Sequence, residues 1–190
     1  MSKLSYYAAA FNLLGMCYLF PPDDDINKTA IRFFKTGDFA TQWPCKINSQ
    51  LCEDIIKAAS ADMSQLKKQW QHLFIEINNL LPALPNNTLY LKLDDIPQSE
   101  LTCRLIEYLK CEQFKSKDDF PNSIESIGLV LFQVATLASK KREDAVNKLL
   151  THYLNTWLPH YLNSVKMSGY SQFYSLLTEL VTITVNAFRK

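Results

Sequence analysis

Histidine is the side chain best suited to acid–base catalysis or metal binding near neutral pH, and the chain holds three: His72, His152 and His160. None follows a glutamate three residues earlier, so the Glu-x-x-His pairs of a di-iron bundle are absent. The sequence also lacks H-E-x-x-H, G-x-S-x-G, a Walker sequence and a dinucleotide fingerprint. It therefore predicts no catalytic residue, no metal site, no cofactor and no enzymatic activity.

Carboxylates and thiols give no stronger indication of chemistry. Asp94–Asp95 and Asp118–Asp119 are neighbours in sequence, so their side chains do not face each other as a catalytic pair would. We interpret them as solvated turns. Five cysteines occur without C-x-x-C spacing, which predicts buried free thiols in a reducing compartment.

Composition limits the classes of protein that fit. With a net charge of +1, the chain offers no basic field for nucleic acid. Apolar residues make up 47% of the sequence, and only 4 residues are glycine, which disfavours a sandwich, a barrel or a phosphate-binding loop. No stretch is apolar for the ~18 residues that a membrane-spanning helix requires. Lys3 precedes an apolar stretch, as in a signal peptide. However, the apolar residues of that stretch recur every three or four positions, which predicts a folded first helix in a cytoplasmic protein instead.

Apolar periodicity and helix-breaking residues predict an all-α fold, a single-domain globular helical bundle of seven or eight helices spanning residues 1–190. The acidic triplet at 23–25 is expected to open the second helix, because carboxylates favour a helix N-terminus. A capping box at 122–125 is expected to open an apolar central helix. The expected helices cover 2–20, about 25–36, 49 onward, 62–77, about 98–109, about 123–139, 143–165 with a break near Pro159, and 171–188.

The segment from Trp70 to Pro97 is the least ordinary part of the chain. Trp70, Leu73 and Phe74 lie on one stripe of a helix, which leads into a proline-broken apolar loop at about 79–97. Loops of this length inside compact domains are usually functional or disordered, and this one is too apolar for a disordered linker. We expect it either to pack on the body or to line a site for another apolar chain.

Several blocks together resemble the DmsD/TorD type of redox-enzyme maturation chaperone, with the Thr-Gln-Trp-Pro loop closer to the DmsD branch. The resemblance covers nearly the whole chain in order, and its most specific element is the Trp-x-x-Leu-Phe block. The blocks are Thr41–Pro44, Trp70–Phe74, Pro85–Leu91, Gly128–Leu131, Tyr153–Trp157 and Phe173–Tyr174.

The resemblance implies an all-helical cytoplasmic chaperone that binds the twin-arginine signal peptide of a molybdenum-cofactor oxidoreductase, such as a dimethyl sulfoxide reductase catalytic subunit, before export. The peptide-binding residues that it implies are Trp70, Leu73, Phe74, Pro85, Asn86, Glu125 and Ser126. Two positions depart from the family pattern. Asn86 replaces an aromatic residue. Counted back without gaps from Trp157, Ser126 replaces the histidine of the Glu-Pro-x-Asp-His signature and Glu125 its aspartate, whereas a shifted alignment would use Asp118–Asp119 instead.

Two interpretations of these residues remain open from the sequence. The aromatic and leucine stripe is equally consistent with core packing and with a peptide-binding surface, and Glu125 with a helix cap and with an arginine receptor. Asp94 and Asp95 are the other candidate acids for the arginine-binding role. A helical adaptor whose client lacks a twin-arginine signal is the alternative function. We expect a monomer or weak homodimer, with no nucleic-acid partner and no membrane span.

Overall fold

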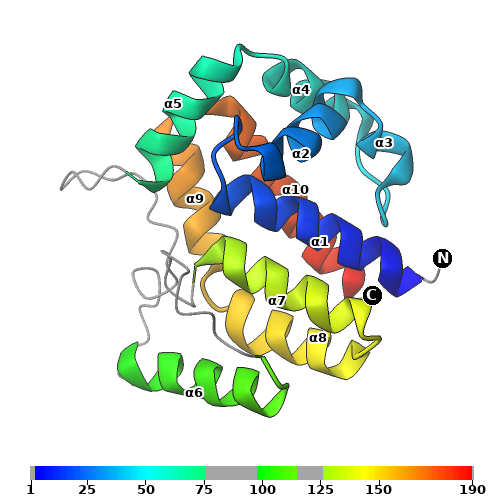
Figure 1. Ribbon diagram of the computed structural model, residues 1–190, viewed down its shortest axis with the longest axis vertical. Coiled ribbons are helices and arrows are strands. Elements are labelled where there is room, and N and C mark those ends of the chain that lie inside the picture. The colour runs from blue at the N-terminus through cyan, green and yellow to red at the C-terminus, as the bar shows by residue number, and fades with distance from the viewer. Residues whose placement is uncertain (1–2, 76–97, 115–125, 190) are drawn as a thin grey trace.

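The computed structural model describes residues 3–75, 98–114 and 126–189 of the 190-residue chain. These residues form ten α-helices and one π-helical turn, and none of them lies in a strand, which confirms the predicted all-α class (Figure 1). The helices are α1 (Lys3–Leu19), α2 (Asp25–Thr36), α3 (Phe39–Gln42), α4 (Ser49–Ala59), α5 (Met63–Phe74), α6 (Gln98–Cys111), α7 (Ile127–Ser139), α8 (Glu143–Leu149), α9 (Leu158–Ser168) and α10 (Gln172–Phe188). The π-helical turn Leu150–Leu154 joins α8 to the segment before α9.

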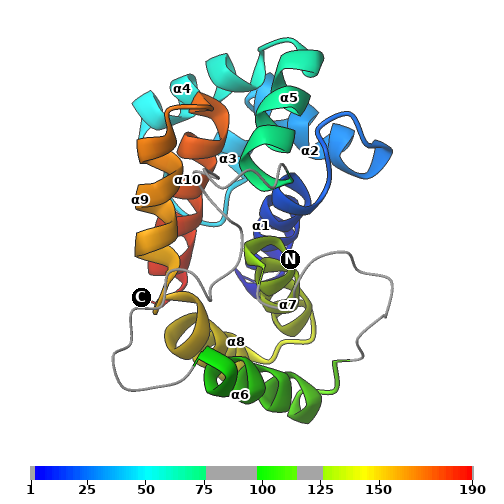
Figure 2. The same ribbon diagram turned by 90° about the vertical axis from the view of Figure 1, so that its left-hand side faces the viewer.

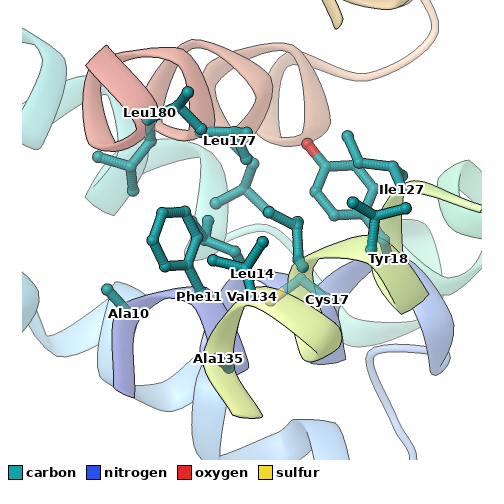
Figure 3. Packing of buried hydrophobic residues seen from close by; sticks show 14 of the residues in the cluster. Ala10, Phe11, Leu14, Cys17, Tyr18, Ile127, Val134, Ala135, Leu177 and Leu180 are labelled. Carbon is teal, nitrogen blue, oxygen red and sulfur yellow. The ribbon is translucent and has the colours of Figure 1, made fainter. Parts of the chain in front are cut away.

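The core is built where α1 packs against α7 and α10. Figure 3 shows side chains of α1, α7 and α10 meeting in one layer, and the labelled ones are all buried. Among the described helices, α1 makes its most extensive contact with α7. The apolar residues of α7 occur around nearly the whole helix, which predicts a central position. In the structure, α7 is buried on nearly all sides, as predicted. The labelled residues are Ala10, Phe11, Leu14, Cys17, Tyr18, Ile127, Val134, Ala135, Leu177 and Leu180.

Two glycines let α1 and α7 approach closely. A Cβ atom on Gly15 would lie 3.0 Å from the carbonyl oxygen of Gly128. A Cβ atom on Gly128 would lie 2.5 Å from the Leu19 Cγ and 3.1 Å from the carbonyl oxygen of Gly15. Because real Cβ contacts are longer than this, the crossing accepts only glycine at position 128 without a shift of Leu19.

Short polar side chains begin several helices where the sequence predicts. Asp24, the middle residue of the acidic triplet, is the N-cap of α2, and its carboxylate accepts a 2.9 Å bond from the Ile26 N–H. Asn48 caps α4 in the same way, through a 2.8 Å bond from the Gln50 N–H. The triplet therefore has the structural role that we expected for it.

Gly37 is the C-cap of α2 and lies in the left-handed region, with φ of 80°. Its replacement by alanine tests how much this C-cap contributes to stability. A Cβ atom there would also lie 2.9 Å from the Ile56 Cδ1. Gly169 has a similar φ of 65°, but a Cβ atom there would meet no heavy atom within 4 Å, so this position isolates the backbone cost. We expect Gly169→Ala to lower the free energy of unfolding by about 1–2 kcal/mol and Gly37→Ala by more, as measured by urea denaturation. Equal losses would contradict the predicted contact with Ile56.

Four details differ from the sequence prediction. The Thr41–Pro44 segment is not all loop, because its first two residues end α3, which the sequence did not predict. The helix predicted at 143–165 does break near Pro159, which lies in the first turn of α9, but a π-helical turn that the sequence did not predict follows α8, and α9 extends to Ser168. The N-cap of α7 is Ser126, four residues later than the capping box predicts. All five cysteines are free, but only Cys17 and Cys52 are buried, whereas Cys45 is half-buried and Cys103 and Cys111 are exposed.

No described helix combines the length and the apolar character that crossing a membrane would take. In both views α6 lies at the opposite end of the molecule from α2, α4 and α5 (Figures 1 and 2). The predicted loop at 79–97 lies outside the described residues.

Candidate functional site

The helix that carries the predicted aromatic stripe, α5, is held at its N-terminus and near its middle. Asp62 caps its N-terminus by accepting a 3.0 Å bond from the Ser64 N–H. One turn later, the Lys67 ammonium lies 2.7 Å from the Asp23 carboxylate in the α1–α2 connection. The hydrogen bond and charge of Lys67 hold the pKa of Asp23 below its usual value. These contacts orient the last turn of α5 toward the C-terminal end of α1.

Trp70 joins α5 to α1 through its indole N–H, which donates a 3.2 Å hydrogen bond to the carbonyl oxygen of Tyr18. That carbonyl belongs to the last turn of α1, where backbone oxygens have no partner within the helix. The indole therefore supplies a partner that α1 cannot supply for itself. The Trp70 side chain is 7% exposed, so it packs in the core with one edge near the surface.

Phe74 and Leu73 differ in their surroundings. The Phe74 ring makes edge contacts with Tyr18, at 5.7 Å between ring centres, and with Tyr174, at 5.1 Å. Such edge-to-face pairs stabilise aromatic clusters by about 0.5–1.5 kcal/mol beyond their buried area. Phe74 keeps 7% exposure, whereas Leu73 is fully buried.

A shallow depression lies where α1, α5 and the beginning of α7 meet. Three of the predicted site residues, Trp70, Phe74 and Ser126, line it although α5 and α7 are distant in the sequence. Its free volume is about 10 Å³, close to the space of one water molecule, so a leucine side chain would need the rim to move. Leu73 does not line it. Among the residues that the structure describes, the lining consists of Tyr18, Leu19, Trp70, Phe74, Ile75, Ser126 and Gly128.

Ser126 has a structural role at this site as the N-cap of α7. Its hydroxyl accepts a 3.4 Å bond from the Leu129 N–H, and the residue is 1% exposed. The family pattern has a histidine here, so the position carries a small cap residue in place of a titratable ring. The remaining predicted residues, Pro85, Asn86 and Glu125, lie outside the described residues.

The chemistry available at the depression is that of a binding surface. None of the described residues that line it carries a charged side chain. Burial raises the pKa of the Tyr18 phenol, and that of Tyr174 behind it, far above neutrality, so both phenols stay protonated. Of the three histidines, only His72 lies on α5, where its ring centre is 4.1 Å from that of Tyr170. The described residues contain no group of three side chains suited to hold a metal ion.

A larger cavity, of about 500 Å³, lies between α6 and the turn from α7 to α8. Arg142 pairs with Glu112 at 2.9 Å, and the Tyr108 hydroxyl donates a 2.7 Å bond to the carbonyl of Ala145. Its charges are of both signs and partly satisfy one another, so it shows no preference for a ligand of either sign. None of the four predicted site residues that the structure describes, Trp70, Leu73, Phe74 and Ser126, lines it.

Sequence reasoning missed four residues of the depression: Tyr18, Leu19, Ile75 and Gly128. Tyr18 belongs to the apolar stripe of the first helix, which indicates burial but not proximity to α5. Gly128 belongs to one of the blocks that carry the family resemblance, which is the only indication that the sequence gives of its place at the site.

No family model matches the chain. It is similar to the "Probable Tat proofreading chaperone DmsD" of Haemophilus influenzae, with 26% identity over 192 aligned residues. The alignment covers 100% of this chain and 91% of that protein, so the similarity is not confined to one segment. This similarity over the full length supports a relationship to the twin-arginine proofreading chaperones that the sequence motifs resemble.

Proposed function

We propose that the chain is a cytoplasmic chaperone that binds the twin-arginine signal peptide of a molybdenum-cofactor oxidoreductase and delays its export until the cofactor is in place. One observation carries the proposal most strongly. Trp70, Phe74 and Ser126 are implied as peptide-binding residues by the family resemblance, and they line a single depression whose described lining residues carry no charge. The similarity to a protein named as a proofreading chaperone, over the full length of this chain, supports the same function.

The proposed guest has a positive end and an apolar middle, and the two parts make different contributions to affinity. Burying one leucine- or phenylalanine-sized side chain is worth ~1.5–3 kcal/mol. An exposed arginine–carboxylate pair is worth roughly 0–1 kcal/mol. We propose that the apolar middle enters at the depression and supplies most of the affinity. Glu125, which directly precedes Ser126, is the proposed receptor for an arginine and sets the register of the peptide.

Entry of a guest side chain requires the rim of the depression to open. Ile75 is 49% exposed on that rim, while the Trp70 and Phe74 rings are held from behind by α1 and α10. Side-chain rearrangement at an interface is common even where the backbone moves little. The site therefore opens by movement of the exposed Ile75 side chain, while the Trp70 and Phe74 rings stay in place and form its wall.

Peptide substitutions separate the two contributions. In calorimetric titration with a synthetic twin-arginine peptide, we expect replacement of one central leucine by serine to weaken binding about ten- to one-hundredfold. Replacement of one arginine by glutamine should weaken it by about fivefold at most, because an exposed ion pair contributes little. A larger loss from the arginine change than from the leucine change would contradict the proposed division. Absence of binding by the unaltered peptide would contradict the function itself.

A helical adaptor for a client without a twin-arginine signal is the second candidate. The observation that favours it is Ser126, whose hydroxyl serves as a helix cap where the family pattern has a titratable histidine. Capture of partners from cytoplasm, repeated with the first 40 or so residues of each partner removed, distinguishes the two. Retention of the shortened partner favours the adaptor, and its loss favours the chaperone.

A further inference from the structure

Large exposed apolar side chains gather around the C-terminal end of α5 and the turn from α9 to α10. Three of the six in the described residues lie there: Ile75 at 49% exposure, Met167 at 78% and Tyr170 at 52%. The Tyr170 ring is in contact with His72, one turn before Ile75 on the same helix. The other three, Tyr6, Ile26 and Met63, belong to α1, α2 and the first turn of α5.

The turn that carries Tyr170 is held in place on both sides. Gly169 ends α9 with φ of 65°, and Ser171 begins α10 by accepting a 3.3 Å bond from the Tyr174 N–H. The Ser171 hydroxyl also donates a 2.7 Å bond to the Gln69 side-chain oxygen on α5. Figures 1 and 2 both place this turn beside α5. Tyr170 is thus a half-exposed ring on a fixed backbone, which loses little conformational freedom when a partner covers it.

These residues continue the depression outward. Ile75 lines the depression and is also exposed outside it, His72 lies one turn earlier on α5, and the Tyr170 ring packs on His72. We call Ile75, His72 and Tyr170 the α5 track. It forms an apolar and aromatic path that begins at the wall of the depression and ends at the α9–α10 turn.

The charges beside the track indicate what it accommodates. Lys166, one residue before Met167, is paired with Glu179 at 3.4 Å, and Lys67 on α5 is paired with Asp23 at 2.7 Å. Both of these cations have acidic partners, whereas Lys68, an exposed lysine one turn before His72 on α5, adds a positive charge beside the track. Met167 adds a flexible side chain that adapts to partners of differing sequence. Because the exposed surface of the track comes from Ile75 and the Tyr170 ring, it suits an apolar rather than a positively charged polypeptide segment.

We infer that the apolar segment of the guest polypeptide leaves the depression along the α5 track and packs on Tyr170. This inference rests on the proposed function and adds a second contact surface to it. The depression receives one side chain of the guest, and the track covers the residues that follow, so that affinity depends on the length of the apolar segment.

Four single variants of the full chain test this inference in titrations with a synthetic twin-arginine peptide. We expect Tyr170→Ser and Ile75→Ser each to weaken binding about three- to tenfold, because the guest would newly bury the roughly half of each side chain that is exposed in the free protein. Tyr6→Ser and Ile26→Ser are matched controls, at 45% and 50% exposure on α1 and α2, and should bind within twofold of the unaltered chain. As a further check, Tyr170→Phe keeps the ring and should retain full affinity.

A peptide with the second half of its apolar segment replaced by serine and glycine gives an independent readout. It should bind the unaltered chain more weakly, and Tyr170→Ser should then cause no additional loss, since the partner of that ring is gone. Undiminished binding by Tyr170→Ser and Ile75→Ser would overturn the track while leaving the proposed function in place. A loss of self-association in sedimentation, without a change in peptide affinity, would overturn it in favour of a contact between copies of this chain. Failure of the unaltered chain to bind the peptide would reject the proposed function itself.

Discussion

Leu73→Ala should lower the free energy of unfolding by about 2–5 kcal/mol. The side chain is fully buried in the last turn of α5, so its removal leaves a cavity that the surrounding rings cannot fill. The residue does not line the depression. We therefore expect the affinity for a twin-arginine peptide, calculated per folded molecule, to stay within about twofold. Urea denaturation and calorimetric titration on the same preparation measure the two quantities.

Ile75→Ala is the matched control, since it also shortens an aliphatic side chain but at a half-exposed position on the depression. It should show the reverse pattern, with stability changed by less than about 1 kcal/mol and peptide binding weakened. A stable Leu73→Ala protein that had lost its peptide affinity would assign Leu73 to the binding surface instead.

Gly128→Ala should also be strongly destabilising, by about 1–3 kcal/mol, although alanine favours helices more than glycine does. The added methyl group would lie 2.5 Å from the Leu19 Cγ, and the carbonyl of Gly15 blocks its retreat at 3.1 Å. Because Leu19 and Gly128 both line the depression, the displaced leucine should change peptide affinity as well. Urea denaturation and peptide titration of the same variant measure both effects.

A double-mutant cycle identifies the cause of this loss. Leu19→Ala removes the atom that the new methyl group meets, so the combined variant should be less destabilised than the sum of the two single variants. Gly15→Ala is the comparison within the same crossing, with its closest contact at 3.0 Å, and should cost less. Additive losses in the double variant would show that the clash with Leu19 is not responsible.

The sequence was sufficient for elements whose causes are local. Asp24 and Asn48 cap helices through their own side chains, and Gly37 ends α2 because of its own backbone, so each is visible in a few consecutive letters. The apolar circumference of α7 likewise predicts its central position. The short helix α3 was missed because four residues are too few to show a period.

The composition of the site depends on contacts that no local pattern contains. The hydrogen bond from Trp70 to the Tyr18 carbonyl joins residues 52 positions apart, and nothing near either residue indicates the other. Trp70 and Phe74 were identified through the family resemblance, which could not tell whether a ring packs inward or faces a guest. In the structure, most of the surface of each ring packs in the core, and one edge of each ring faces the depression.

Because of its position, Trp70 can serve as an intrinsic fluorescence probe of the depression. The chain holds 3 tryptophans, and the other two lie elsewhere: Trp43 donates to the Thr184 hydroxyl, and Trp157 is fully buried against Tyr161. Only Trp70 lines the depression, so water leaving that hollow changes the surroundings of one indole among three. Emission from Trp70 should shift to shorter wavelength as the hollow fills, above a constant background from the other two.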